Sequence, residues 1–323
     1  MRRRTFITLI GGSAAAWPLV VRAQEAGRTY RLGVLAPFSR EEPASLPFFN
    51  ELRRLGFIEG RNLAIYYRDF GPHVNLISEY AVELVKDRVD VIWGAGGAAI
   101  RAAQQATKTI PIFGMADDMV GEGLVDSLAR PNGNTTGLSI FAGELDGKRQ
   151  EILIEAVRGL RRMATLADAN TTPVAKLDVL REAARARNIE LSIHRIAGGG
   201  EIAAAIDMAQ ASGAAALNVL ASPMLFGNRQ LIMDRVAALR LPAIYQWPDT
   251  AEEGGFVAYG PRFAKLYELL AQQAVKLFRG IKVADIPVEQ PTKFELVINL
   301  KTAKALGLTI AESFLVNADR VIE

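Results

Sequence analysis

The stretch Val89-Asp90-Val91-Ile92-Trp93-Gly94-Ala95-Gly96-Gly97-Ala98-Ala99 passes from a β-branched and aromatic run, through a glycine-rich turn, into an alanine-rich segment. Apolar β-branched residues favour a buried strand, whereas the alanines that follow favour a helix, here over 98–107, with Pro111 beyond its end. A strand that turns directly into a helix is half of a βα unit, from which parallel sheets are built. The stretch therefore predicts an α/β fold.

On both sides of this stretch, short apolar runs alternate with longer amphipathic segments, in two successive sets. The strands expected in the first set are Arg31–Pro37, Leu63–Phe70, Val89–Ala95, Ile110–Met115 and Thr136–Phe141. Those expected in the second set are Met163–Ala167, Glu190–Ile196, Ala214–Leu220, Ala243–Trp247 and, as the last, Phe256–Gly260. The pattern predicts two doubly wound, parallel-sheet (Rossmann-like) domains. Because ligands bind beyond the carboxyl ends of such strands, we expect a cleft between the domains.

The composition is that of a folded two-domain protein. The chain has 323 residues, of which 50% are hydrophobic and 23% charged, and domains typically contain roughly 100–200 residues. It has no cysteine, which excludes disulfides, thiolate metal sites and a cysteine nucleophile. Its net charge of +3 includes four arginines in the first 23 residues, and without them it is −1. We therefore expect no nucleic-acid partner.

The first 23 residues have the three-part pattern of an export signal. Met1–Arg4 is basic, Phe6–Val21 is mostly apolar, and Val21-Arg22-Ala23 places small residues where a signal peptidase cleaves. The apolar run is shorter than the ~20 residues that a membrane span needs. Arg3-Arg4 resembles a twin-arginine signal, although the general secretory route stays open. We expect cleavage after about Ala23 and a periplasmic mature protein.

Polar and aromatic residues follow the expected strands at the edge where ligands bind. The residues selected on this ground as ligand-binding are Phe38, Ser39, Gly96, Gly97, Asp117, Asp168, Asn170, Thr172, Ser222, Trp247 and Tyr259. Such a rim can hold a carboxylate on helix N-termini, pair a cation with an aspartate and stack a ring. For each polar residue, capping is an equally good interpretation, and Thr172 before Pro173 fits an N-cap. For Trp247 and Tyr259, packing in the core or the hinge is the alternative.

One motif supports an enzyme as an alternative. Gly94–Ala99 fits the Gly-x-Gly-x-x-Ala fingerprint of dinucleotide sites, and Asp117 follows where a ribose-binding acid belongs. Against an exported dinucleotide-dependent oxidoreductase, the motif follows the third expected strand rather than the first, and no proton donor stands out. His73 and His194 have no neighbours with metal-ligand spacing. We therefore expect no catalytic residues, no cofactor and no metal.

Four segments resemble a known family: Pro291–Leu308, Glu51–Asn62, Val89–Ile92 and Ser127–Gly137. Together they are similar to the ABC transporter substrate-binding proteins of the tryptophan/tyrosine-binding type. The resemblance implies a non-enzymatic periplasmic binding protein of type I, which captures a small solute and delivers it to an inner-membrane permease with a separate ATPase. By similarity, the ligand would contact the residues selected above, although the loops around Phe38 and Asp168 depart from the family pattern.

The resemblance also implies how the chain is divided. Two lobes are joined by several hinge crossovers: an N-terminal lobe of residues 29–141 plus about 261–290, and a C-terminal lobe of residues 142–260 plus about 291–323. We expect a monomer that traps an aromatic or other carboxylate or amino-acid-like solute by hinge closure. The identity of the solute stays open, as does a sensory role through a membrane receptor.

Overall fold

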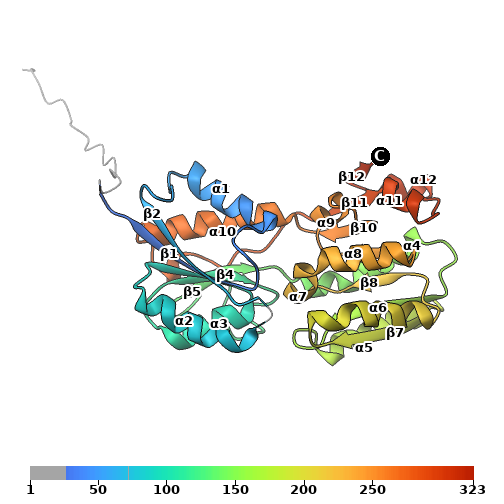
Figure 1. Ribbon diagram of the computed structural model, residues 1–323, viewed down its shortest axis with the longest axis horizontal. Coiled ribbons are helices and arrows are strands. Elements are labelled where there is room, and N and C mark those ends of the chain that lie inside the picture. Colours follow the sequence, from blue (N-terminus) through green and yellow to red (C-terminus); the bar gives the residue numbers. More distant parts are fainter. Residues whose placement is uncertain (1–26, 72) are drawn as a thin grey trace, which may run out of the picture.

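The computed structural model describes residues 27–71 and 73–323, so the predicted export signal lies outside the described residues. The chain forms two lobes (Figure 1). The elements of the first, N-terminal lobe are β1 (Tyr30–Ala36), α1 (Leu46–Arg54), β2 (Leu63–Asp69), α2 (Ile77–Lys86), β3 (Val91–Ala95), α3 (Gly97–Ala106), β4 (Ile112–Ala116), β5 (Thr135–Ser139) and, from late in the chain, α10 (Phe263–Phe278). Its sheet has the order β2-β1-β3-β4-β5, and all its strand pairs are parallel.

The second, C-terminal lobe repeats this plan and extends it. Its elements are α4 (Asp146–Ala156), β6 (Arg162–Asp168), α5 (Val174–Ala186), β7 (Glu190–Ile196), α6 (Ile202–Ala211), β8 (Leu217–Val219), α7 (Pro223–Gly227), α8 (Arg229–Ala238), β9 (Ala243–Tyr245), α9 (Pro248–Glu252), β10 (Val257–Gly260), β11 (Glu295–Asn299), α11 (Leu300–Ala305), α12 (Glu312–Leu315) and β12 (Arg320–Ile322). The order β7-β6-β8-β9-β10 matches that of the first sheet strand for strand. The predicted α/β fold with two doubly wound domains is confirmed.

Two local predictions are wrong. Phe256–Gly260 is not the last strand, because β11 pairs antiparallel with β10 and β12 then pairs parallel with β11. Both additional strands follow α10 in the chain, beyond the end of the predicted alternating pattern. The strand expected over Ala214–Leu220 is only Leu217–Val219, because the amide of Ala214 still bonds to Ala209 at the end of α6.

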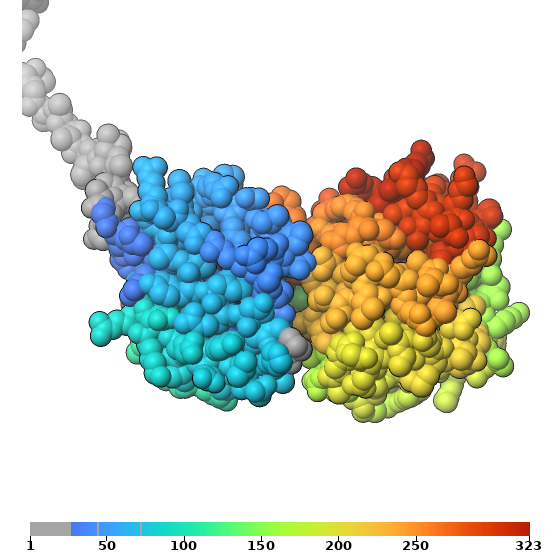
Figure 2. Space-filling model, viewed as in Figure 1, coloured from blue at the N-terminus to red at the C-terminus, as the bar shows by residue number. Residues whose placement is uncertain are grey.

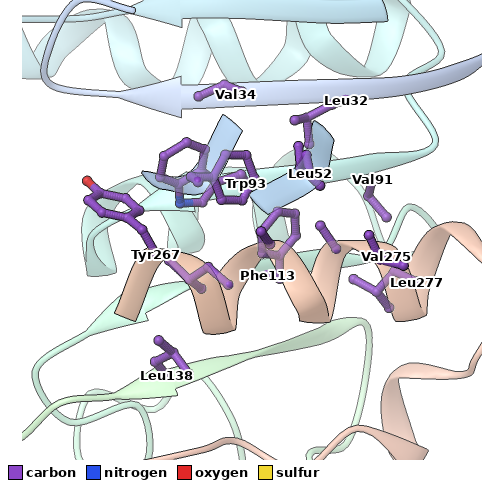
Figure 3. Packing of buried hydrophobic residues seen from close by; sticks show 14 of the residues in the cluster. Leu32, Val34, Leu52, Val91, Trp93, Phe113, Leu138, Tyr267, Val275 and Leu277 are labelled. Carbon is purple, nitrogen blue, oxygen red and sulfur yellow. The ribbon is translucent and has the colours of Figure 1, made fainter. Parts of the chain in front are cut away.

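Helix α10 completes the core of a lobe that the chain otherwise builds in its first half. It packs against α1 and against β3, β4 and β5, while α2 and α3 cover the opposite face of the sheet (Figure 1). Its buried residues, which include Phe263, Leu266, Leu270 and Leu277, recur at helical spacing. Figure 3 shows Tyr267, Val275 and Leu277 of α10 beside Trp93 and Phe113 of the sheet.

The chain crosses between the lobes through three segments, which we call crossovers. The first crossover is 140–145, between β5 and α4; the second is 261–262, between β10 and α10; the third is 286–294, between the end of the α10 region and β11. Glu289 of the third crossover bonds to β5 through its amide and carbonyl, so this crossover stays with the N-terminal lobe up to that residue. The lobes are therefore joined near one edge of each sheet.

The first prediction tests the role of α10. Leu270→Ala removes a fully buried side chain from the face that covers the N-terminal sheet, and we expect it to lower the free energy of unfolding by about 2–5 kcal/mol. Met208→Ala, at an exposed position of α6, is the control and should change it by less than about 0.5 kcal/mol. Urea unfolding followed by circular dichroism measures both; equal effects would show that α10 adds little to the core.

Candidate functional site

The strand order locates the crevice in each lobe. In a sheet of this order, the connections leave β1 and β3 in opposite directions, which opens a crevice beyond their carboxyl ends. The corresponding strands of the C-terminal lobe are β6 and β8. The two crevices face each other, since a Cβ placed on Gly96, after β3, would lie 3.8 Å from the ring of Pro223, after β8. Figure 2 shows the two lobes side by side with a furrow between them.

On the N-terminal side, the first strand places Phe38 and Ser39 at this edge. Phe38 is half-buried against the lobe core, its ring centroid lies 6.4 Å from that of Trp93, and its carbonyl accepts a 3.0 Å hydrogen bond from the hydroxyl of Tyr67. Ser39 is exposed. The loop thus places a half-buried aromatic ring and an exposed serine after β1.

The glycine turn after β3 is required by its surroundings. Gly96 has φ +100° at the N-cap of α3, a conformation that favours glycine, and a Cβ on Gly97 would lie 2.0 Å from Oε2 of Glu122. A carboxylate of the chain itself therefore lies against this helix N-terminus, so a bound anion would face it. Burial raises the pKa of Glu122, and the nearby charges of Asp117 and Asp118 raise it further.

Asp117, after β4, connects the two lobes. Its Oδ1 accepts a 2.9 Å hydrogen bond from the amide of Gly143 in the first crossover, and its Oδ2 pairs at 3.0 Å with Nζ of Lys176 on α5. In a dinucleotide site this acid would bind a ribose instead. Here both oxygens already have protein partners.

On the C-terminal side, Asp168 organises the rim. Its Oδ2 accepts a 2.7 Å bond from the hydroxyl of Ser222 and its Oδ1 a 2.9 Å bond from the amide of Asn170, while its carbonyl accepts the amide of Thr172. Asp168, Thr172 and Ser222 are buried and Asn170 is exposed, so four selected residues form one cluster at the ends of β6 and β8.

The expected N-cap at Thr172 is wrong. Helix α5 begins at Val174 with Pro173 at its N-cap, and no side chain caps it. The serine–proline pair further along the chain is the one that caps a helix: the hydroxyl of Ser222 accepts the amides of Met224 and Leu225 at the start of α7. Ser222 reaches this position because it lies three residues beyond the end of β8.

Of Trp247 and Tyr259, only Trp247 lies between the lobes. It is 3% exposed and its ring contacts Phe263 edge-on at 4.8 Å between centroids. Tyr259 packs in the C-terminal lobe core, with its ring centroid 6.4 Å from that of Phe294. The structure does not bring Tyr259 to the other selected residues, because along β10 it points to the face covered by α4.

Trp247 belongs to a series of touching rings that runs from one lobe to the other, which we call the aromatic belt. Its members are Trp93, Tyr267, Phe263, Trp247 and Phe226, with centroid distances of 5.6 Å for the first pair, 4.6 Å for the second and 4.8 Å for the third. The indole N–H groups of both tryptophans are buried and have no hydrogen-bond acceptor among the described residues. In Figure 3 the indole nitrogen of Trp93 faces Tyr267.

Sequence reasoning missed four residues near the candidate site: Tyr67, Phe226, Arg229 and Tyr267. Arg229 pairs with Glu253 of its own lobe at 2.6 Å and reaches Glu42 of the other lobe at 2.9 Å, with its guanidinium 4.6 Å from the ring centre of Phe226. Tyr267 was detectable, because it lies four residues after Phe263 on the apolar stripe. The other three lie within helices or strands, where no sequence signal marks them.

Among the described residues, no group of three or more His, Asp or Glu side chains could hold a metal ion. His194 is half-buried on β7, where burial lowers its pKa, and His73 is exposed. No helix in the described part of the chain is long and apolar enough to span a membrane.

A model of the ABC transporter substrate-binding protein family matches residues 47–322. The chain belongs to this family. Substrate-binding proteins of ABC transporters are extracytoplasmic and non-enzymatic. A tyrosine-binding protein of Clostridioides difficile (strain R20291) is 28% identical to this chain over 274 residues, covering 83% of the chain and 77% of that protein.

Solved structures share the fold of this substrate-binding protein. A conserved domain protein of Vibrio cholerae O1 biovar El Tor superposes with a TM-score of 0.81 at 22% identity, covering 91% of this chain and 100% of that protein's chain. A domain from Streptococcus pneumonia in complex with L-Trp gives a TM-score of 0.77 at 21% identity, over 91% and 100% of the two chains. Nothing in these comparisons supports the oxidoreductase alternative.

The second prediction follows from the environment of Glu122. The pKa of this carboxyl is higher in the folded than in the unfolded protein. The folded state therefore loses stability relative to the unfolded state as the pH rises from the unfolded-state pKa through the folded-state pKa. Glu122→Gln cannot ionise, so its melting temperature minus that of the wild type should be larger at pH 7 than at pH 4. Glu155→Gln, at an exposed position of α4, is the control. A difference that is the same at both pH values would contradict the prediction.

Proposed function

We propose that this substrate-binding protein traps a small aromatic amino acid or aromatic acid between its lobes and delivers it to an inner-membrane permease driven by a separate ATPase. The observation that carries the proposal is the aromatic belt, which joins the facing crevices of the two lobes. Aromatic rings bind other rings in edge-to-face or offset-stacked geometry. The tyrosine-binding relative and the L-Trp complex of the structural neighbour support the same class of solute.

The polar groups around the aromatic belt would bind the charged groups of the solute, while the belt binds its ring. Asp168 is the carboxylate that would pair with an ammonium group, and backbone amides after β1 would bind a carboxylate. We assign Phe38, Ser39, Gly96, Gly97, Asn170, Thr172 and Ser222 to the walls of the site. Tyr259 is left out of this assignment, because it packs on Phe294 instead.

Closure follows from the division of these groups between the lobes. A solute that touches both walls gains its full set of contacts only when the lobes approach, so it shifts the population toward the closed form. The ion pairs Glu42–Arg229 and Asp117–Lys176 join the lobes and add to the closed state. Both are partly exposed, so each contributes about 0–1 kcal/mol.

The export signal, the periplasm and the monomeric state belong to the same proposal. A protein that collects solute for an inner-membrane permease has to work on the outer side of that membrane. The predicted export signal of residues 1–23 directs the chain to the periplasm, and the mature chain then begins near Gln24.

The third prediction identifies the solute class. A ligand that prefers the native state raises the melting temperature, by an amount equivalent to about 2.7 kcal/mol at 100 times its Kd. We expect L-tyrosine, L-tryptophan, L-phenylalanine or benzoate to produce such a shift, and L-alanine and L-leucine to produce a smaller one. Trp93 and Trp247 report the same binding through intrinsic fluorescence, because both lie in the belt. A panel in which only aliphatic compounds stabilise the protein would overturn the aromatic assignment.

Asp168→Asn tests the carboxylate. It keeps an acceptor for Ser222 and removes the charge, so binding of an aromatic amino acid should weaken by at least about tenfold, the effect of losing about 1.4 kcal/mol. Asp178→Asn, at an exposed position of α5, is the matched control and should leave binding unchanged. Titration calorimetry measures both. Unchanged affinity in Asp168→Asn would remove Asp168 from the site.

The fifth prediction tests closure. Small-angle scattering at saturation with the compound that stabilises the protein most should give a smaller radius of gyration than the ligand-free protein. The same radius in both states would reject hinge closure while leaving the solute assignment intact.

A further inference from the structure

A buried arginine lies where two of the three crossovers meet the C-terminal lobe. Arg149 of α4 is fully buried, and its guanidinium donates to the carbonyl of Ala142 in the first crossover and, at 3.1 Å, to the carbonyl of Tyr259, just before the second. Asp146, one turn earlier on α4, accepts a 2.6 Å hydrogen bond from the same guanidinium and is also buried. One side chain thus bonds to two chain segments that are far apart in the sequence.

The partner carboxylate extends this network to the rim of the site. Oδ1 of Asp146 also accepts the amide of Ala221 at 3.4 Å, directly before Ser222, and the carbonyl of Asp146 accepts the side-chain amide of Asn218 at 3.3 Å. The backbone at the start of the second crossover is tightly packed, because a Cβ on Gly260 would lie 2.0 Å from the carbonyl oxygen of Gln246. The ends of both crossovers that join the C-terminal lobe are therefore fixed to the same part of that lobe as the rim.

Phe141, the residue before Ala142, is bonded to the N-terminal lobe. The amide of Phe141 donates at 2.8 Å to the carbonyl of Asp117, at the end of β4 in the N-terminal lobe. Phe141 has φ +45° and ψ +35°, a left-handed conformation that a bulky residue rarely adopts. Bonds to the two lobes meet in the peptide unit between Ala142 and Gly143, whose carbonyl is bonded to Arg149 and whose amide is bonded to Oδ1 of Asp117. The strained residue Phe141 directly precedes this unit.

We propose that Arg149, held by Asp146, is the positioning residue of the hinge, which fastens the first two crossovers to the C-terminal lobe so that the first crossover bends at Phe141. The inference rests on the closure in the proposed function, to which it adds the place of bending. The C-terminal rim, with Asp168 and Ser222, then moves as one body with α4, and the geometry of its half of the site is the same in the open and closed forms.

The chemistry of the side chain explains why an arginine is needed. A guanidinium offers five donors in a planar fork and can bond to two carbonyls and a carboxylate at once, whereas an ammonium is a compact point charge. Arg149→Lys therefore keeps the charge for Asp146 but cannot hold both crossovers. Arg149→Met keeps much of the volume and leaves both carbonyls unpaired.

Because the sequence contains no cysteine, introduced cysteines can be spin-labelled selectively to measure the distance between the lobes. Val82→Cys on α2 and Met208→Cys on α6 introduce one spin label in each lobe at exposed positions. Double electron–electron resonance then gives the distribution of distances between the lobes in the ligand-free protein, so the result does not depend on knowing the solute. We expect Arg149→Lys and Arg149→Met to broaden this distribution relative to the labelled wild type.

A second pair of variants tests the bending point while leaving Arg149 intact, and decides the question should the arginine variants fail to fold. Phe141→Gly releases the strained backbone, and Phe141→Ala removes the same ring while keeping the strain. The proposal requires a broader or shifted distribution in Phe141→Gly than in Phe141→Ala. Equal distributions in this pair, or a wild-type distribution in a folded Arg149 variant, would overturn the assignment, even if an aromatic solute binds as proposed.

Discussion

The packing of α10 on the N-terminal sheet is the constraint on which the rest of the structure depends. Without this helix, the face of the sheet that carries Trp93 and Phe113 would lack its main cover. Each fully buried large apolar side chain contributes about 1.5–3 kcal/mol, so the lobe gains much of its stability from a segment that arrives after the second sheet has begun. The chain must therefore return to its first lobe, and the crossovers follow from that return.

The same helix connects stability to the candidate site. Phe263 and Tyr267, on its first two turns, are members of the aromatic belt, and Phe263 touches Trp247 of the opposite lobe. A helix that completes a core in one lobe thus presents its N-terminal end to the other. The crossovers, the belt and the facing crevices lie close together, so groups that determine how the lobes are joined also line the space between them.

Much of the candidate site was predictable, because its position depends on strand ends. Asp168 and Ser222 were selected for following apolar runs, and the parallel arrangement of β6 and β8 brings them within 2.7 Å. Tyr259 was selected on the same ground but lies within β10, where alternation directs its ring to the opposite face. Arg229 was missed because its partners Glu42 and Glu253 are distant in the sequence and no local pattern relates them.

The sequence by itself determined the fold class, the duplication of the α/β pattern and the sheet edge at which the candidate site lies, because hydrophobic periodicity and strand–turn–helix signals are local. Only the tertiary structure decided that β11 and β12 extend the second sheet, that Ser222 rather than Thr172 caps a helix, and that Arg149 joins two crossovers. Those features depend on contacts between segments that are far apart in the chain. Their geometry is set by how whole elements pack, and the residues next to them in the sequence do not indicate it.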